Sequence, residues 1–309
     1  MKLKSIYFIV IISVFFLSGC NNSFTKATDE KMTFKIGVEN RKYDQHRPDG
    51  VTVVTIKVAQ WPGNEFGLWL PEDIMMGEKF VWTDWQDPDV WPNWKPGDAY
   101  QDFTQRPDGS LVWKKTFKDI DFRSELRPDE KNSCIWYKHT FTNISDKPLY
   151  DLNAISCFHL VNAPQFISID GSRYWADLDG KWTTTDTVPR CESPDPRRIG
   201  FKKQGLRQER TVVPNFVFPS AVMPQASCHP LFIAESFDAA ASVGVADRNY
   251  DGLFNNNDSV LRCLHSHPAP IKVLQPGQTV EREAVIVFCR GNHNDLLKHY
   301  EKITADVWK

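Results

Sequence analysis

Alternating apolar and polar residues, interrupted by short turn sequences, are the feature that most limits the folds open to this chain. The alternation is clearest from Cys134 to Thr142 and from Leu149 to Leu160, with a turn composition over 143–148 between them. This pattern predicts two strands joined as an antiparallel hairpin. Further strand candidates are 51–58, 231–237, 241–246, 260–265, 271–274 and 281–289. Such spacing is typical of a sandwich or a barrel, and we expect an all-β, large antiparallel β-sandwich.

The composition also favours strands over helices. The chain has 11 Trp, 20 Phe and 8 Tyr, and its 20 Pro outnumber its 16 Gly. Aromatic residues fit strands, and proline interrupts helices. One short C-terminal helix is expected over 294–307, where Asn294 can cap it and apolar residues recur at helical spacing. This helix would close an open edge of the sheet.

The first twenty residues predict export. Two lysines precede an apolar run over residues 6–16 that is too short for a stable membrane span, and small residues lead to Cys20. This ending resembles the lipobox of bacterial lipoproteins, in which the cysteine thiol is acylated and the preceding segment is removed. Lipidation is therefore expected at Cys20. The alternative is an ordinary signal peptide that ends near a cysteine.

These features predict the organisation and location of the chain. We expect a signal peptide over 1–19, a lipidated cysteine and flexible tether over 20–31, and a single sandwich domain over 32–309. The expected location is the bacterial cell envelope, anchored in a membrane outside the cytoplasm, at the outer membrane or cell surface. Without residues 1–19 the chain has 35 basic and 39 acidic side chains, which argues against nucleic acid as a partner.

Six cysteines remain after Cys20 from the seven in the chain. In an oxidising compartment they could form up to three disulfides, but several lie within predicted strands, where cysteine also serves as a small buried hydrophobe. We expect at most one or two bridges. No Cys-x-x-Cys pair occurs, so the sequence does not favour a zinc site.

The segment 81–94 is dense in tryptophan and acids and is interrupted by proline, which predicts a loop. Indole faces stack on sugar rings, and carboxylates accept hydrogen bonds from sugar hydroxyls. The candidate carbohydrate-binding residues are Trp82, Asp84, Trp85, Trp91 and Trp94. The alternative is that these tryptophans cover the core, as most tryptophans do.

Three histidines are candidate catalytic residues. In a strand, His265 and His267 project to the same face, where they could act as an acid and base pair or bind a metal. His159 could join them if the fold brings it near, and so could His229. The alternative is a pair of histidines that hydrogen-bond to the backbone.

The segment 247–258 matches the start of a calcium loop, with glycine at the expected sharp turn. The candidate ligands are Asp247, Asn249, Asp251, Asn255 and Asp258. Calcium is thus a possible cofactor. The flanks are predicted strands rather than helices, however, and a hairpin rich in Asn, Asp and Gly needs these residues in any case.

Three segments carry a resemblance to a known fold: 136–149, the Cys-Leu-His sequence at 263–265, and 274–278. With them the chain resembles secreted bacterial proteins of unassigned function that have a galactose-mutarotase-like supersandwich, over roughly 51–300. The resemblance implies this fold and the handling of carbohydrate, because the fold occurs in sugar epimerases, polysaccharide lyases and noncatalytic carbohydrate modules. The mutarotase pattern of a His acid and a Glu base has no matching motif here.

The expected function is therefore that of a lipid-anchored carbohydrate-binding protein, with a role in polysaccharide utilisation. One alternative is a carbohydrate-active enzyme, a lyase or epimerase with a histidine base. The other is a structural or assembly lipoprotein whose aromatic loop docks another protein. The enzyme alternative requires the histidines and an acid to converge, whereas a docking protein needs an exposed apolar patch.

Overall fold

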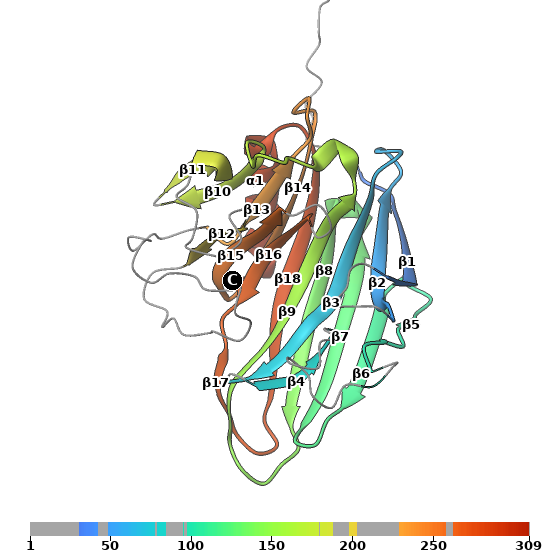
Figure 1. The fold of residues 1–309 in the computed structure, drawn as a ribbon, viewed down its shortest axis with the longest axis vertical. Coiled ribbons are helices and arrows are strands. Elements are labelled where there is room, and N and C mark those ends of the chain that lie inside the picture. Colours follow the sequence, from blue (N-terminus) through green and yellow to red (C-terminus); the bar gives the residue numbers. More distant parts are fainter. Residues whose placement is uncertain are drawn as a thin grey trace, which may run out of the picture.

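The computed structural model describes residues 31–42, 49–77, 79–84, 95, 98–178, 180–187, 198–202, 229–257 and 262–308, with the backbone alone for 178, 198–202 and 251–257. Its strands form two antiparallel sheets that pack face to face (Figure 1). In the first sheet the order is β1-β2-β3-β9-β16-β15-β12, with β4 beside β3 and β17 beside β9. These strands are β1 (Phe34–Arg41), β2 (Val51–Val58), β3 (Glu65–Met76), β4 (Lys79–Thr83), β9 (Leu149–Asn162), β12 (Arg198–Lys202), β15 (Tyr250–Asn257), β16 (Arg262–Pro268) and β17 (Ile271–Leu274).

The second sheet has the order β11-β10-β13-β14-β18-β8-β7-β6-β5. Its strands are β5 (Thr104–Gln105), β6 (Leu111–Thr116), β7 (Ile120–Asp129), β8 (Cys134–Asn143), β10 (Tyr174–Leu178), β11 (Lys181–Thr184), β13 (Phe232–Glu235), β14 (Ala241–Asp247) and β18 (Thr279–Arg290). Three short 3-10 helices, η1 (Glu130–Asn132), η2 (Pro164–Phe166) and η3 (Thr185–Thr187), lie in connections. The all-β antiparallel sandwich predicted from the alternation is confirmed.

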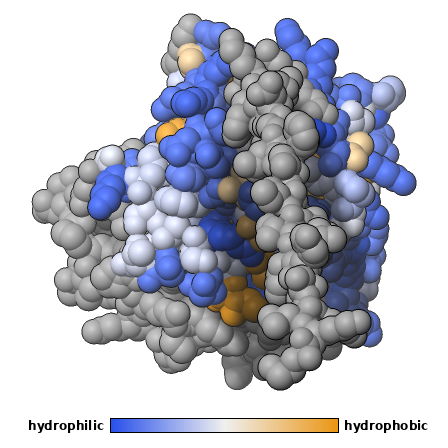
Figure 2. Space-filling model, turned by 90° about the horizontal axis from the view of Figure 1, so that it is seen from above, coloured by the Kyte–Doolittle hydropathy of each residue, from blue (hydrophilic) through white to orange (hydrophobic). Residues whose placement is uncertain are grey.

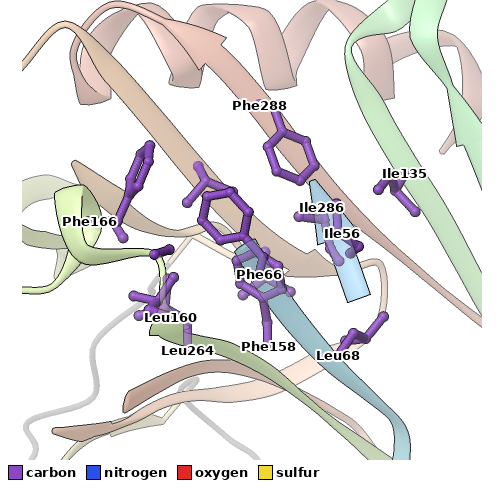
Figure 3. Packing of buried hydrophobic residues seen from close by; sticks show 14 of the residues in the cluster. Ile56, Phe66, Leu68, Ile135, Phe158, Leu160, Phe166, Leu264, Ile286 and Phe288 are labelled. Carbon is purple, nitrogen blue, oxygen red and sulfur yellow. The ribbon is translucent and has the colours of Figure 1, made fainter. Parts of the chain in front are cut away.

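The main core fills the space between the two sheets (Figure 3). Phe66 and Phe158, from adjacent strands of the first sheet, stack with ring centroids 5.5 Å apart. Phe288 of the second sheet meets Phe66 edge to face at 5.7 Å. Each such buried ring contributes about 1.5–3 kcal/mol relative to an exposed one. This packing fixes which face of each strand points away from the second sheet.

The turn over 143–148, which the sequence predicts to join a hairpin, instead carries the chain from the second sheet to the first. β8 pairs with β7 and β18, whereas β9 pairs with β3, β16 and β17, so the prediction that β8 and β9 pair is wrong. β17 and β18 are likewise in different sheets. Asn143 links the β8–β9 connection to the β17–β18 connection. Its Nδ2 donates to the carbonyl oxygens of Lys147 and Leu274, at 2.8 Å each. Alternation identifies the buried face of a strand but not its partner.

Helix α1 (His293–Val307) packs on the outer face of the second sheet. Its side chains Leu296, Tyr300 and Ile303 are buried against that sheet. The helix is confirmed, but its expected cap is wrong: Asn292, not Asn294, forms the capping box with Asp295.

Among the described residues no helix is both long and apolar enough to cross a bilayer. The coloured surface seen from above is mostly hydrophilic, with isolated hydrophobic residues (Figure 2).

Candidate acid-base site on the first sheet

Histidine and cysteine side chains gather on the outer face of the first sheet, at its centre. Strands β9 and β16 are adjacent there, with Phe158 opposite Leu264 in the core between the sheets. Side chains alternate between the faces of a strand, so the residues on either side of these two point away from the second sheet. These outer residues are Cys157, His159, Cys263 and His265, each 1–3% exposed.

His265 is the centre of this group, because both of its ring nitrogens contact another titratable side chain. Its Nε2 lies 2.9 Å from Sγ of Cys263. Its Nδ1 lies 3.4 Å from Nε2 of His267 and 4.0 Å from Oε2 of Glu72. The predicted same-face placement of the two histidines is thus what the structure has. His267 is partly exposed, whereas His265 is 2% exposed.

Glu72 reaches this face through an irregularity in β3. The pairing of β3 with β9 shifts between Trp69 and Asp73, so several β3 residues oppose a single residue of β9. Gln101 stabilises this bulge, because its Nε2 donates to the carbonyl oxygens of Leu70 and Pro71, at 3.1 and 3.2 Å. Glu72 is 6% exposed. A carboxylate therefore lies buried beside two imidazoles.

His159 and His229 have different surroundings. His159 lies opposite Cys263 on the same face, and its ring meets Trp69 edge to face with centroids 3.8 Å apart. His229 lies with Trp182 and Tyr300 on the outer face of the second sheet, where burial lowers its pKa to about 4. Three of the four histidines considered from the sequence therefore share one face, and His229 does not.

The structure describes only the first four residues of the tryptophan segment, 81–84. Trp82 is 3% exposed, packs on Trp113 and donates from Nε1 to the carbonyl of Asp98 at 2.8 Å. This corrects the expectation for Trp82, whose indole face is covered by the core. Asp84 is 2% exposed, and its backbone N–H donates to the Glu72 carbonyl at 3.1 Å. The remaining candidates of the segment, Trp85, Trp91 and Trp94, lie outside the described residues.

The predicted calcium loop is also corrected by the structure. Asp247 is the last residue of β14 and is 3% exposed, facing inward between the sheets, whereas Asn249 is exposed in the turn that follows. Asp251 and Asn255 lie in the paired strand β15. An extended strand cannot wrap its side chains around one ion as a calcium loop does. Asp258 lies outside the described residues, as do Cys20 and the rest of 1–30.

Sequence reasoning missed Glu72 and the placement of Cys157 and Cys263 beside His265. Both site strands carry the same three-residue pattern, Cys-Phe-His at 157–159 and Cys-Leu-His at 263–265. In a strand this pattern puts cysteine and histidine on one face around a core residue, so the repeat is a signal that could have linked the two segments. Glu72 gives no such signal, because its orientation depends on the bulge.

Solved structures of galactose-mutarotase-like proteins are similar to this chain. A candidate aldose 1-epimerase from Klebsiella pneumoniae has 13% identity and a TM-score of 0.46, with 90% of this chain and 89% of that chain covered. The galactose mutarotase related enzyme from Lactobacillus acidophilus has 10% identity, TM-score 0.39 and coverage of 84% and 99%. The GalM/aldose epimerase homologue from C. elegans has 9% identity, TM-score 0.41 and coverage of 84% and 100%. The sequence matches no protein-family model and no curated protein.

Proposed function

We propose that this protein is a lipid-anchored, extracytoplasmic protein that acts on a carbohydrate by proton transfer on the outer face of its first sheet. One observation carries the proposal: Nδ1 of His265 lies 3.4 Å from Nε2 of His267 and 4.0 Å from Oε2 of Glu72. Three groups able to hold a proton thus meet at one ring nitrogen. Epimerases and lyases need an acid and a base held together in this manner.

The three groups have distinct roles in this proposal. His267 is the partly exposed member, so it is the group that exchanges a proton with the substrate. His265 and Glu72 are buried behind it and act as positioning residues. One proton occupies the contact between the two rings, which leaves Nδ1 of His267 as the nitrogen that takes up or releases the substrate proton. The products of such a step are an inverted sugar centre or an unsaturated sugar.

The tryptophan segment supports a carbohydrate as the substrate. It leaves the sheet at Asp84, which is bonded to the Glu72 carbonyl, and the chain returns at Gln101, which holds the bulge beside Glu72. Asp84 and Gln101, which flank the tryptophan residues in the sequence, therefore both contact the bulge that carries Glu72. The three tryptophans of 85–94 and the neighbouring acids are the residue types that stack on sugar rings and accept hydroxyl protons.

Turnover tests the proposal. The purified protein is offered a panel of aldoses, followed by NMR exchange between sugar forms, and a panel of uronic-acid polysaccharides, followed by ultraviolet absorbance of unsaturated products. The variant His267→Gln is expected to lose about 10²–10⁴-fold of the rate, as is typical when a general acid or base is removed. His229→Gln is the matched control, because that histidine lies on the other sheet. Equal rates for His267→Gln and the unmodified protein would overturn the proposal.

Carbohydrate binding without turnover is the second candidate, favoured by the composition of the tryptophan segment alone. It predicts that glycan binding on an array survives His267→Gln but is lost when Trp85, Trp91 and Trp94 are replaced by alanine. Equal binding by both variants would contradict this second candidate.

The anchor is tested separately, because Cys20→Ala should leave the membrane fraction if Cys20 is acylated. A variant that stays in that fraction would contradict lipidation at Cys20.

A further inference from the structure

Two thiols and an imidazole converge at the centre of the candidate site. Sγ of Cys157, Sγ of Cys263 and one ring nitrogen of His265 all lie within 4.8 Å of one another, and all three residues are buried. We propose that these three side chains form a binding site for a thiophilic divalent cation of the Zn²⁺ type. The site goes beyond the proton-transfer function proposed above, and metal binding can be measured without any substrate.

The strand register favours a shared ion over a disulfide. Cys263 lies directly opposite His159, so Cys157 is its diagonal neighbour across the β9 and β16 pair. Diagonal residues of an antiparallel pair are about 7–8 Å apart at Cα, at or beyond the reach of an unstrained disulfide. The cysteines in the described ranges are reduced. A metal ion bridges such thiols without moving the backbone, because each metal–sulfur bond adds about 2.3 Å.

The surroundings of His265 orient it as metal-binding histidines are oriented. Its Nε2 faces the thiol of Cys263 at 2.9 Å, while its Nδ1 faces Glu72 and His267. A neutral imidazole that binds a metal through Nε2 must carry its proton on Nδ1, and that N–H is usually held by a carboxylate or another acceptor. His267 supplies such an acceptor, with its Nε2 at 3.4 Å, and the carboxylate of Glu72 lies 4.0 Å from the same nitrogen. The same contacts that place the proton therefore leave Nε2 directed at the two thiols.

The ligand types determine the class of ion. Thiolate and imidazole select Zn²⁺ and related soft cations, whereas calcium and magnesium require oxygen ligands. Binding converts two thiols to thiolates and releases two protons, so affinity should increase with pH. Three protein ligands leave a fourth position open, as in catalytic zinc sites. With His265 bound to the ion, substrate proton exchange would still fall to His267.

Metal titration tests the site. The purified protein, reduced and freed of metal, is titrated with Zn²⁺ and separately with Co²⁺ as a spectroscopic probe. We expect one ion per chain and a thiolate-to-cobalt charge-transfer band. Cys157→Ser and Cys263→Ser should weaken Zn²⁺ binding by more than about a hundredfold, because even loss of an outer-shell partner typically costs about 10–100-fold. Cys134→Ser and Cys289→Ser are the matched controls, since both are buried cysteines in the second sheet.

Several outcomes would overturn the site. They are the absence of a charge-transfer band in the unmodified protein, equal affinity in the site and control variants, and a Cys157–Cys263 disulfide found by peptide mass spectrometry. The cobalt spectrum of the unmodified protein needs no variant, so a variant that fails to fold does not prevent the test. Turnover lost in His267→Gln with no metal bound would leave the proton-transfer function standing and remove the metal site alone.

Discussion

At the scale of single residues, two buried histidines differ in their contacts, and this difference separates a structural role from the role proposed for His265. His139 lies in the core between Ser124 and Ser156, each 2.9 Å from one of its ring nitrogens, and burial lowers its pKa to about 3. Hydroxyls satisfy both nitrogens, so this ring stays neutral and holds the core together. His265 is equally buried, but its ring nitrogens contact a thiol, a second imidazole and a carboxylate. Only the latter set can exchange protons among its members.

Asp247 gives a prediction at the same scale. It is 3% exposed, and its Oδ2 has no hydrogen-bond partner among the described residues. Burial raises the pKa of this carboxyl well above its usual value, although Ser266 and Arg282 oppose the shift. The unfolded chain therefore releases this proton at lower pH than the folded protein does, and stability falls as the pH rises above about 4. Asp247→Asn should remove that fall and raise the free energy of unfolding at pH 7 by on the order of 1–3 kcal/mol.

Urea denaturation at several pH values measures this effect. Asp238→Asn is the control, because hydrogen bonds from Ser236 and Ala240 lower the pKa of that exposed carboxyl. Its contribution has the opposite sign: it is present above the unfolded pKa and is lost as the pH falls. An Asp247→Asn variant with unchanged pH dependence would show that the buried carboxyl is not held neutral.

At the scale of elements, the N-terminal cap of α1 is Asn292 in the structure, whereas the sequence predicts Asn294. Asn292 accepts from the backbone N–H groups of Asn294 and Asp295, so Asn292→Ala should destabilise the protein by about 1 kcal/mol. Asn294 is exposed in the first turn, and Asn294→Ala should change stability by less than about 0.5 kcal/mol. Thermal unfolding of the two variants compares them directly. A larger loss of stability in Asn294→Ala than in Asn292→Ala would show that Asn294 is the cap, as the sequence predicts.

The strands named from the sequence were predictable as elements because their alternation reports local burial, but their partners were not, and other strands such as β3 and β7 were not predicted. The segments 134–142 and 149–160 were predicted close to the bounds of β8 and β9, and yet these strands lie in different sheets. In the site, alternation placed His265 and His267 on one face correctly. The approach of Cys157 and Glu72 depends on the pairing of β16 with β9 and on the bulge in β3. Both are long-range features that residue spacing does not encode.

At the scale of the whole molecule, the outer faces of the two sheets differ in what covers them. Helix α1 and its apolar contacts cover the second sheet, as is typical of a structural face. The first sheet carries buried cysteine, histidine and carboxylate groups at its centre, and the backbone of Asp84 bonds to the Glu72 carbonyl beside them. Burying such groups costs free energy unless they are paired or bind a ligand. The proposed chemistry therefore lies on the outer face of the first sheet, and helix α1 covers the outer face of the second.

The most direct measurement of this proposal is a double-mutant cycle in turnover, with Glu72→Gln, His267→Gln and both changes together. If the two residues act through His265 as one proton-transfer unit, the double variant should be about as slow as the slower single variant. Melting temperatures close to that of the unmodified protein would show that the fold is intact. Losses that multiply in the double variant, or full turnover in both single variants, would contradict a shared proton path on this face.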